Sequence, residues 1–143
     1  MKKLYLKLTE LLATVPGLRW VDLDMGQMQD ENPMVAFPCA LLAIDALQTE
    51  NISRSIQHVR GAFSVKIYVL TAGNTNVQTP EIHREKALAY LDLTEQIHKV
   101  LQGYADANFY PFERVSARQE AGRQGVTAMV LRFETSWRDD SSN

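Results

Sequence analysis

Apolar residues at the start of the chain recur at the spacing of one helical face, at Leu4, Leu8, Leu11, Leu12 and Val15. This period predicts an amphipathic helix with one side directed toward a core. Pro16 and Gly17 follow directly and end the pattern, as is typical just beyond a helix C-terminus. We therefore expect the chain to begin with an amphipathic helix.

The next part of the chain has apolar runs and a two-residue period, both typical of β-strands. The pattern predicts a strand at 20–24, a polar loop at 25–33, a strand at 40–47, a polar connection at 48–55 and a strand at 57–70. Pro38 precedes the second strand, where a proline is tolerated because it does not interrupt a central strand. The third is the clearest, because Phe63, Val65, Ile67 and Val69 alternate with more polar residues.

The remaining pattern predicts a long helix and a closing hairpin. It indicates a loop at 73–78, a helix from Thr79 and Pro80 to near Gly103, a strand at 112–119, a turn at 120–125 and a strand at 126–138. Thr79 offers an N-cap hydroxyl, and Pro80 suits the first helical position, where its missing N–H has no cost. The apolar stripe of this helix consists of Tyr90, Leu93, Ile97, Val100, Leu101 and Tyr104.

Together these elements predict an α+β fold, a mostly antiparallel sheet with two helices in the order α-β-β-β-α-β-β. Antiparallel pairing is expected because the connections between the first strands are too short for crossover helices. The 143 residues suffice for one core, since a chain of this size buries roughly 68–70% of its unfolded surface. We expect a single domain at 1–138 and a disordered C-terminal tail at 139–143.

Composition indicates an ordinary globular domain and excludes few functional classes. Apolar residues make up 45% and charged residues 22%, as in a globular domain, and the net charge of −2 favours no polyanionic partner. No apolar run approaches the roughly 20 residues that cross a bilayer, so no membrane partner is expected. Cys39 is the only cysteine, which rules out a disulfide framework within the chain and suits a reducing cytoplasm.

Two acidic patterns resemble metal sites without completing one. Glu95 and His98 have the spacing that places a carboxylate and an imidazole on one helical face. Such sites need further ligands on a facing helix, and the first helix offers only Glu10, so a solvated pair is expected. Asp22 and Asp24 could hold a divalent cation, although exposed strands commonly carry such residues. We therefore predict no metal ligands.

No catalytic residue is predicted either. Cys39 could be a nucleophile only in an electropositive, partly open setting, and its neighbours Phe37, Pro38, Ala40 and Leu41 favour a buried, inert thiol. Phosphate-binding loops, nucleophile elbows and dinucleotide fingerprints are all absent from the sequence. The chain is therefore expected not to be an enzyme and to need no cofactor.

Arginines are concentrated in the closing hairpin, at positions Arg114, Arg118, Arg123, Arg132 and Arg138. Strand periodicity places Arg114, Ser116 and Arg118 on one strand face, and Arg132, Glu134, Ser136 and Arg138 on another. Such a surface could bind phosphate, but Glu113, Glu120 and Glu134 dilute its charge and the aromatic residues of a single-strand binder are missing. A solvated or protein-facing surface is expected, with no direct nucleic-acid binding.

The predicted sheet has apolar residues on both faces. If Phe63, Val65, Ile67 and Val69 face the helices, the opposite face receives Leu41 or Leu42, Tyr68, Leu70, Ala128 and Val130. A sheet with helices on one side should be polar there. Either each face is covered by one helix, or the second face is buried against another chain. The residues predicted for a protein interface are Tyr68, Leu70, Val130, Arg114, Arg118 and Arg132.

Three strand segments accompany the predicted order of elements: Phe-Pro-Cys-Ala-Leu-Leu at 37–42, Gly-Ala-Phe-Ser-Val-Lys-Ile-Tyr-Val at 61–69 and Val-Leu-Arg-Phe-Glu-Thr-Ser-Trp at 130–137. Together, the order and the segments resemble the tail terminator (tail completion) proteins of long-tailed phages and prophages. The resemblance implies a subunit of a ring, commonly a hexamer, that caps the tail tube and contacts the head connector. It implies assembly in the bacterial host cytoplasm and a place in the virion. It assigns no site residues.

Two alternatives belong to other functional classes. A small-molecule-binding α+β domain would use a cavity between helix and sheet, and a pocket lined by Trp20, Tyr90 and Trp137 would favour it. A metal-dependent enzyme would use Asp22 and Asp24.

Overall fold

The computed structural model describes residues 1–70, 77, 78, 80–120 and 125–141, leaving aside the side chains at 82, 83 and 86. Its elements are α1 (Lys2–Leu12), β1 (Trp20–Leu23), the short 3-10 helix η1 (Gln27–Gln29), β2 (Cys39–Asn51), β3 (Gln57–Leu70), α2 (Glu81–Leu101), β4 (Glu113–Glu120) and β5 (Val126–Asp139). The predicted α+β fold and its order α-β-β-β-α-β-β are confirmed.

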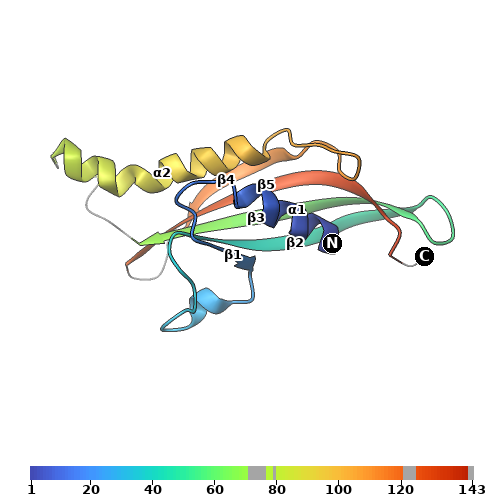
Figure 1. Ribbon diagram of the computed structural model, residues 1–143, viewed down its shortest axis with the longest axis horizontal. Coiled ribbons are helices and arrows are strands. Elements are labelled where there is room, and N and C mark those ends of the chain that lie inside the picture. Colours follow the sequence, from blue (N-terminus) through green and yellow to red (C-terminus); the bar gives the residue numbers. More distant parts are fainter. Residues whose placement is uncertain (71–76, 79, 121–124, 142–143) are drawn as a thin grey trace.

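The strands form a single five-stranded sheet in the order β1-β2-β3-β5-β4 (Figure 1). The pairs β2–β3, β3–β5 and β4–β5 are antiparallel. The pair β1–β2 is parallel, because the connection at residues 24–38 is long enough to return the chain to the starting end of the sheet. The sheet is therefore mostly antiparallel, as predicted, with β1 and β4 at its edges.

Strand lengths differ from the sequence prediction mainly in β2. β3 has the predicted bounds, whereas β2 does not end at residue 47 but continues to Asn51, where its register with β3 reaches Gln57. The polar residues at 48–51 gave no apolar signal, yet the ladder with β3 extends through them. β5 continues to Asp139, which pairs with Gln57. The proposed tail at 139–143 stays a prediction.

Both helices have the predicted apolar stripes. In α1 the buried residues are Leu4, Leu8 and Leu12, and α2 begins at Glu81 with Pro80 at its N-cap position. The N-cap predicted at Thr79 lies outside the described residues, as do most of the loop predicted at 73–78 and of the turn predicted at 120–125. No helix in the described part of the chain is long and apolar enough to span a membrane.

The core lies on one face of the sheet, and both helices contribute to it. Phe63 of β3 stacks on Phe133 of β5 at a centroid distance of 5.1 Å and meets the edge of Phe112 at 5.0 Å. The same cluster of buried residues includes Leu4, Leu8 and Leu12 of α1, Leu93, Ile97 and Leu101 of α2, and Leu42, Val59, Val65, Ile67, Leu131 and Trp137 of the sheet. The alternative of one helix on each face is therefore not realised.

Candidate functional site: the open face and the free edges of the sheet

The side of the sheet turned away from both helices is called the open face here, and the strand register defines its rows. One row crosses Leu41, Lys66, Val130 and Arg118 on β2, β3, β5 and β4. The adjacent rows pass through Ser64 and Arg132, through Tyr68 and Ala128, and through Asp45, Ala62 and Glu134. Charged and apolar side chains therefore share this face.

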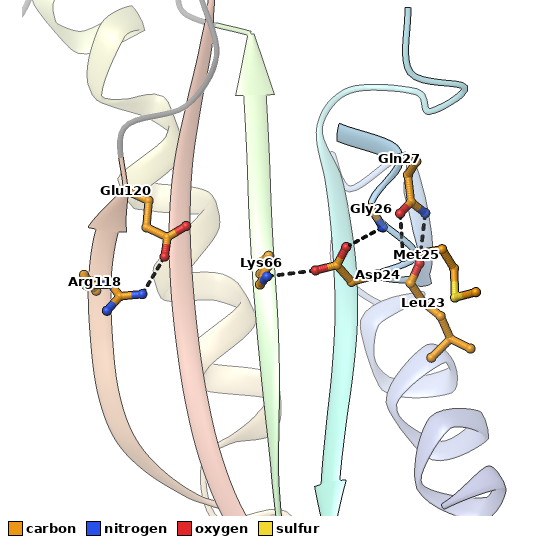
Figure 2. Close-up of polar contacts among 8 residues, drawn as sticks. All are labelled: Leu23, Asp24, Met25, Gly26, Gln27, Lys66, Arg118 and Glu120. Carbon is orange, nitrogen blue, oxygen red and sulfur yellow. Dashed lines mark hydrogen bonds and ion pairs between the residues drawn. The ribbon is translucent and has the colours of Figure 1, made fainter. Parts of the chain in front are cut away.

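An ion pair at the β1 side fixes the turn that leads into η1. The Lys66 ammonium lies 2.8 Å from Asp24 Oδ2, and the Gly26 backbone N–H donates to Asp24 Oδ1 at 3.1 Å (Figure 2). Burial raises the pKa of Asp24, but the hydrogen bonds from Lys66 and Gly26 outweigh it, and the net pKa is lowered. The hydrogen bond to Asp24 raises the pKa of Lys66. Both groups are therefore held in their charged forms.

Further ion pairs cross the open face. Arg118 pairs with Glu120 along β4 (Figure 2), Arg132 lies 3.6 Å from Asp45, and Arg60 lies 3.7 Å from Glu134. Each of these arginines has a carboxylate partner. The arrangement favours the solvated or protein-facing interpretation over a phosphate-binding face.

The apolar residues of the open face are less exposed than the sequence pattern predicted. Val130 is only 9% exposed although no helix lies over it. Lys66 and Arg118 stand opposite it on the neighbouring strands, where their aliphatic stems can cover it while their charges stay in water. Tyr68 is half-buried, and burial raises its pKa. Leu70, 61% exposed, is the prominent apolar residue at this end of β3.

Arg114 does not belong with the other predicted interface residues, and its predicted strand face is wrong. A bulge between Arg114 and Ser116 shifts the register, so that Arg114 stands opposite Phe133 of the core face while Ser116 stands opposite Arg132 of the open face. Burial and the nearby Arg114 charge lower the pKa of His98 on α2, which agrees with this placement. A bulge reverses the strand periodicity on which the prediction relied.

Cys39 is fully buried, as predicted, and burial raises the pKa of its thiol to about 11. A thiol in this state is a poor nucleophile at neutral pH. Its slow reaction with thiol reagents stays a prediction.

The predicted metal patterns gain no additional ligands in the described part of the chain, where no group of three or more His, Cys, Asp and Glu side chains could hold an ion. Asp24 is engaged by Lys66 and Gly26, and Asp22 accepts a hydrogen bond from the Leu23 N–H at 2.8 Å. Glu95 is exposed, and the imidazole of His98 lies over Phe133 with a centroid distance of 6.2 Å.

An apolar groove lies between the first half of α2 and the nearby end of the sheet. Its volume is about 460 Å³, and Tyr90, Leu93, Val69 and Phe37 are among the residues that line it. Of the three aromatic residues expected in a ligand pocket, Tyr90 lines this groove, Trp137 lines a different hollow beside Tyr110, and Trp20 lines neither. The specific pattern that would have favoured a small-molecule site is not formed.

Two free strand edges form the part of the site that sequence reasoning missed. β4 is an edge strand whose residues from 113 to 119 are exposed on both faces. β1 covers the outer edge of β2 only from Cys39 to Leu42, and β2 is exposed from Asp45 to Asn51. Figure 1 shows the β2–β3 hairpin extending past both helices. The polar composition of 48–55 predicts a connection, and that of 113–120 predicts a solvated or protein-facing surface, so neither pattern indicates a free strand edge.

Comparison with solved structures finds several chains of similar fold, one of which is a distant likeness. No family model matches the chain, and no curated protein matches it. A chain of the solved "Virion of native gene transfer agent (GTA) particle" is similar with a TM-score of 0.45 and 11% identity, over 96% of this chain and 91% of that chain. A likeness of this size carries no functional argument.

Proposed function

We propose that this chain is a structural subunit of a phage-type particle, a tail terminator that forms a ring on the tail tube and contacts the head connector. The observation that carries the proposal is the exposure of whole strands. Residues 113–119 of β4 and residues 45–51 of β2 lie outside the core of their own chain. A subunit that completes its packing against other subunits would present such elements.

Exposed strands of this length have a physical cost that assembly removes. A strand gains stability when at least one of its faces packs on a core, and an unpaired strand edge offers N–H and C=O groups to other chains. β4 packs on no core within the described residues and pairs on one side only. Contact with neighbouring subunits would bury its faces and satisfy its outer edge.

The open face supplies the rest of the proposed contact surface. Tyr68 and Leu70 provide apolar area, whereas Val130 is largely covered by its neighbours. Arg118 and Arg132 provide charges that can exchange their present carboxylate partners for those of another subunit. Arg114 falls outside this surface because of the β4 bulge. Burial of the apolar area would favour association by roughly 25 cal/mol per Å², before the costs of association are subtracted.

Deletion of the gene tests the proposed role directly. A particle without its terminator should assemble tails of uncontrolled length that fail to join heads, and electron microscopy of the particles measures both properties. Tails of normal length joined to heads would contradict the terminator role.

Point variants test the open face. Tyr68→Glu or Leu70→Lys should preserve circular dichroism and thermal stability while abolishing ring formation or tail completion. Leu6→Lys on α1 is the matched control, because Leu6 is 51% exposed but lies far from the open face. Normal tails with both open-face variants would exclude this face as the interface, and unfolding of both would show that it stabilises the monomer instead.

A further inference from the structure

The sheet has free edges on opposite sides, and the two edges have similar length. On one side, β4 presents its outer edge over eight residues. On the other, β1 is the edge strand in the described part of the chain, and it ends opposite Leu42 of β2. Among the described residues, the only further backbone hydrogen bond to this edge comes from the Asp24 N–H to the Leu42 carbonyl. The edge at 43–51 is therefore available for pairing.

The strand directions suit a head-to-tail contact between two copies. β2 and β5 run one way, and β3 and β4 run the other way. Rotation about an axis parallel to the strands preserves these directions, so β4 of one copy meets β2 of the next in antiparallel orientation. The same rotation places open face beside open face. Repeating such a heterologous contact closes a ring when the rotation angle divides a full turn.

Charges at the centres of the two edges are complementary. The free part of β2 carries Asp45 and Glu50 and no basic residue, whereas β4 carries Arg114 and Arg118 between two acidic residues at its ends, Glu113 and Glu120. Asp45 and Arg118 both lie on the open face. Opposite charges on directly facing residues stabilise a strand pair, and like charges destabilise it.

A register that places Arg118 opposite Asp45 also places Glu113 opposite Glu50, where like charges oppose pairing at the far end of the ladder. Two other features of the strands agree with this register. It ends with Glu120 beside Ala43, the first β2 position that β1 leaves free. It also brings two bulges to the same level, since β4 is irregular between Arg114 and Ser116 and β2 between Ala46 and Gln48. A bulge increases the local twist of a strand. Because the bulges of β4 and β2 lie at the same height along the proposed ladder, both strands twist at the same point and can stay side by side.

We infer that β4 of one copy pairs antiparallel with residues 43–51 of β2 in the next copy, which makes one continuous sheet around the ring. This inference rests on the proposed ring and names the contact that closes it. The occupant of each free edge is the other edge of a second copy, because length and direction match and Arg118 meets Asp45 at the centre of the contact.

Cross-linking between engineered thiols tests this contact. The variant with both Asp45→Cys and Arg118→Cys, treated at high protein concentration with a short bismaleimide, should give a ladder of covalent oligomers on a denaturing gel. The buried native Cys39 should not react. Two single variants serve as controls, together with a pair in which Glu10→Cys on α1 replaces Asp45→Cys. Circular dichroism verifies that each variant folds.

A charge exchange provides an independent measurement. Arg118→Glu should raise the concentration needed for assembly by about tenfold, a loss of roughly 1.4 kcal/mol. Adding Asp45→Arg to the same chain should restore assembly, as measured by sedimentation.

The two proposals fail in different ways. If the Asp45→Cys/Arg118→Cys variant folds but gives no ladder, or no more than the Glu10→Cys control, the edge pairing is overturned. An Arg118→Glu variant that assembles at the native concentration would overturn it as well. Overlong tails after deletion of the gene would still support the terminator role in that case. Conversely, a ladder together with normal tails in the deletion strain supports the edge pairing and overturns the terminator role.

Discussion

The two faces of β3 differ in what holds their side chains in place. On the core face, Phe63 and Val65 are completely buried and belong to a cluster that includes residues of both helices and of β2, β3 and β5. On the open face, the intervening Ser64 and Lys66 face other strand side chains and water, and Lys66 is fixed by one ion pair. The same strand therefore belongs to a close-packed core on one side and to a charged surface on the other.

The two faces of β3 should therefore contribute differently to the stability of the fold and to the proposed assembly. A buried aromatic residue is held by dispersion contacts and by removal from water, and neither changes when a partner arrives. Partly exposed ion pairs contribute little to the free energy of unfolding and can change partners at low cost. Substitutions on the core face should consequently affect folding, whereas substitutions on the open face should affect the proposed contacts with other subunits.

The largest expected effect comes from emptying the core face at its centre. Phe63→Ala removes a ring packed between Phe112 and Phe133, and it should lower the free energy of unfolding by about 3–5 kcal/mol. Its neighbour Ser64→Ala on the open face should change that free energy by less than about 0.5 kcal/mol. Urea denaturation of both variants measures the contrast. Equal losses of unfolding free energy in the two variants would mean that both faces of β3 stabilise the fold to a similar extent.

A smaller but sharp effect is expected at Gly61, where β3 lies under an indole ring. A Cβ atom at this position would lie 2.3 Å from Trp137 Cη2 and 2.8 Å from the Asp45 carbonyl oxygen. Because the tryptophan is packed in the core and the carbonyl belongs to β2, neither can move freely. Gly61→Ala should therefore cost about 1–3 kcal/mol. Thermal denaturation measures it, and a second substitution, Trp137→Leu, should recover part of the loss by removing the clash.

The fold could be predicted from the sequence because its core face has a clear period. β3 was delimited correctly, since Phe63, Val65 and Ile67 alternate with more polar residues. The continuation of β2 to Asn51 had no such signal, because residues on both of its sides meet water and their pairing with β3 is a property of the folded ladder. Parallel pairing of β1 also depends on the path of residues 24–38, which composition does not specify.

The candidate site was only partly predictable. Strand alternation correctly placed Tyr68, Ala128 and Val130 on the face away from the helices. It misplaced Arg114, because a one-residue bulge reverses the alternation without changing the sequence pattern. The free edges of β2 and β4 could not be found in this way, since an edge is defined by the order of strands in the sheet.

The smallest expected effect concerns the ion pair between Lys66 and Asp24, and it appears as a dependence of stability on pH. The pKa of Asp24 is lowered in the folded chain, so its contribution is present above the unfolded pKa of about 3.9 and is lost as pH falls through the folded value. The pKa of Lys66 is raised, so its contribution is lost only when pH rises above about 10.4. Both side chains still contact water, and the pair should contribute about 0.5–1 kcal/mol to the free energy of unfolding.

The Lys66→Met variant should therefore lose less stability than the native chain between about pH 6 and pH 3 in urea titrations. Lys3→Met is the matched control, because the Lys3–Asp140 pair is longer, 3.7 Å, and more exposed. An unchanged acid slope in Lys66→Met would mean that hydrogen bonding from Gly26 alone holds Asp24 in its charged form.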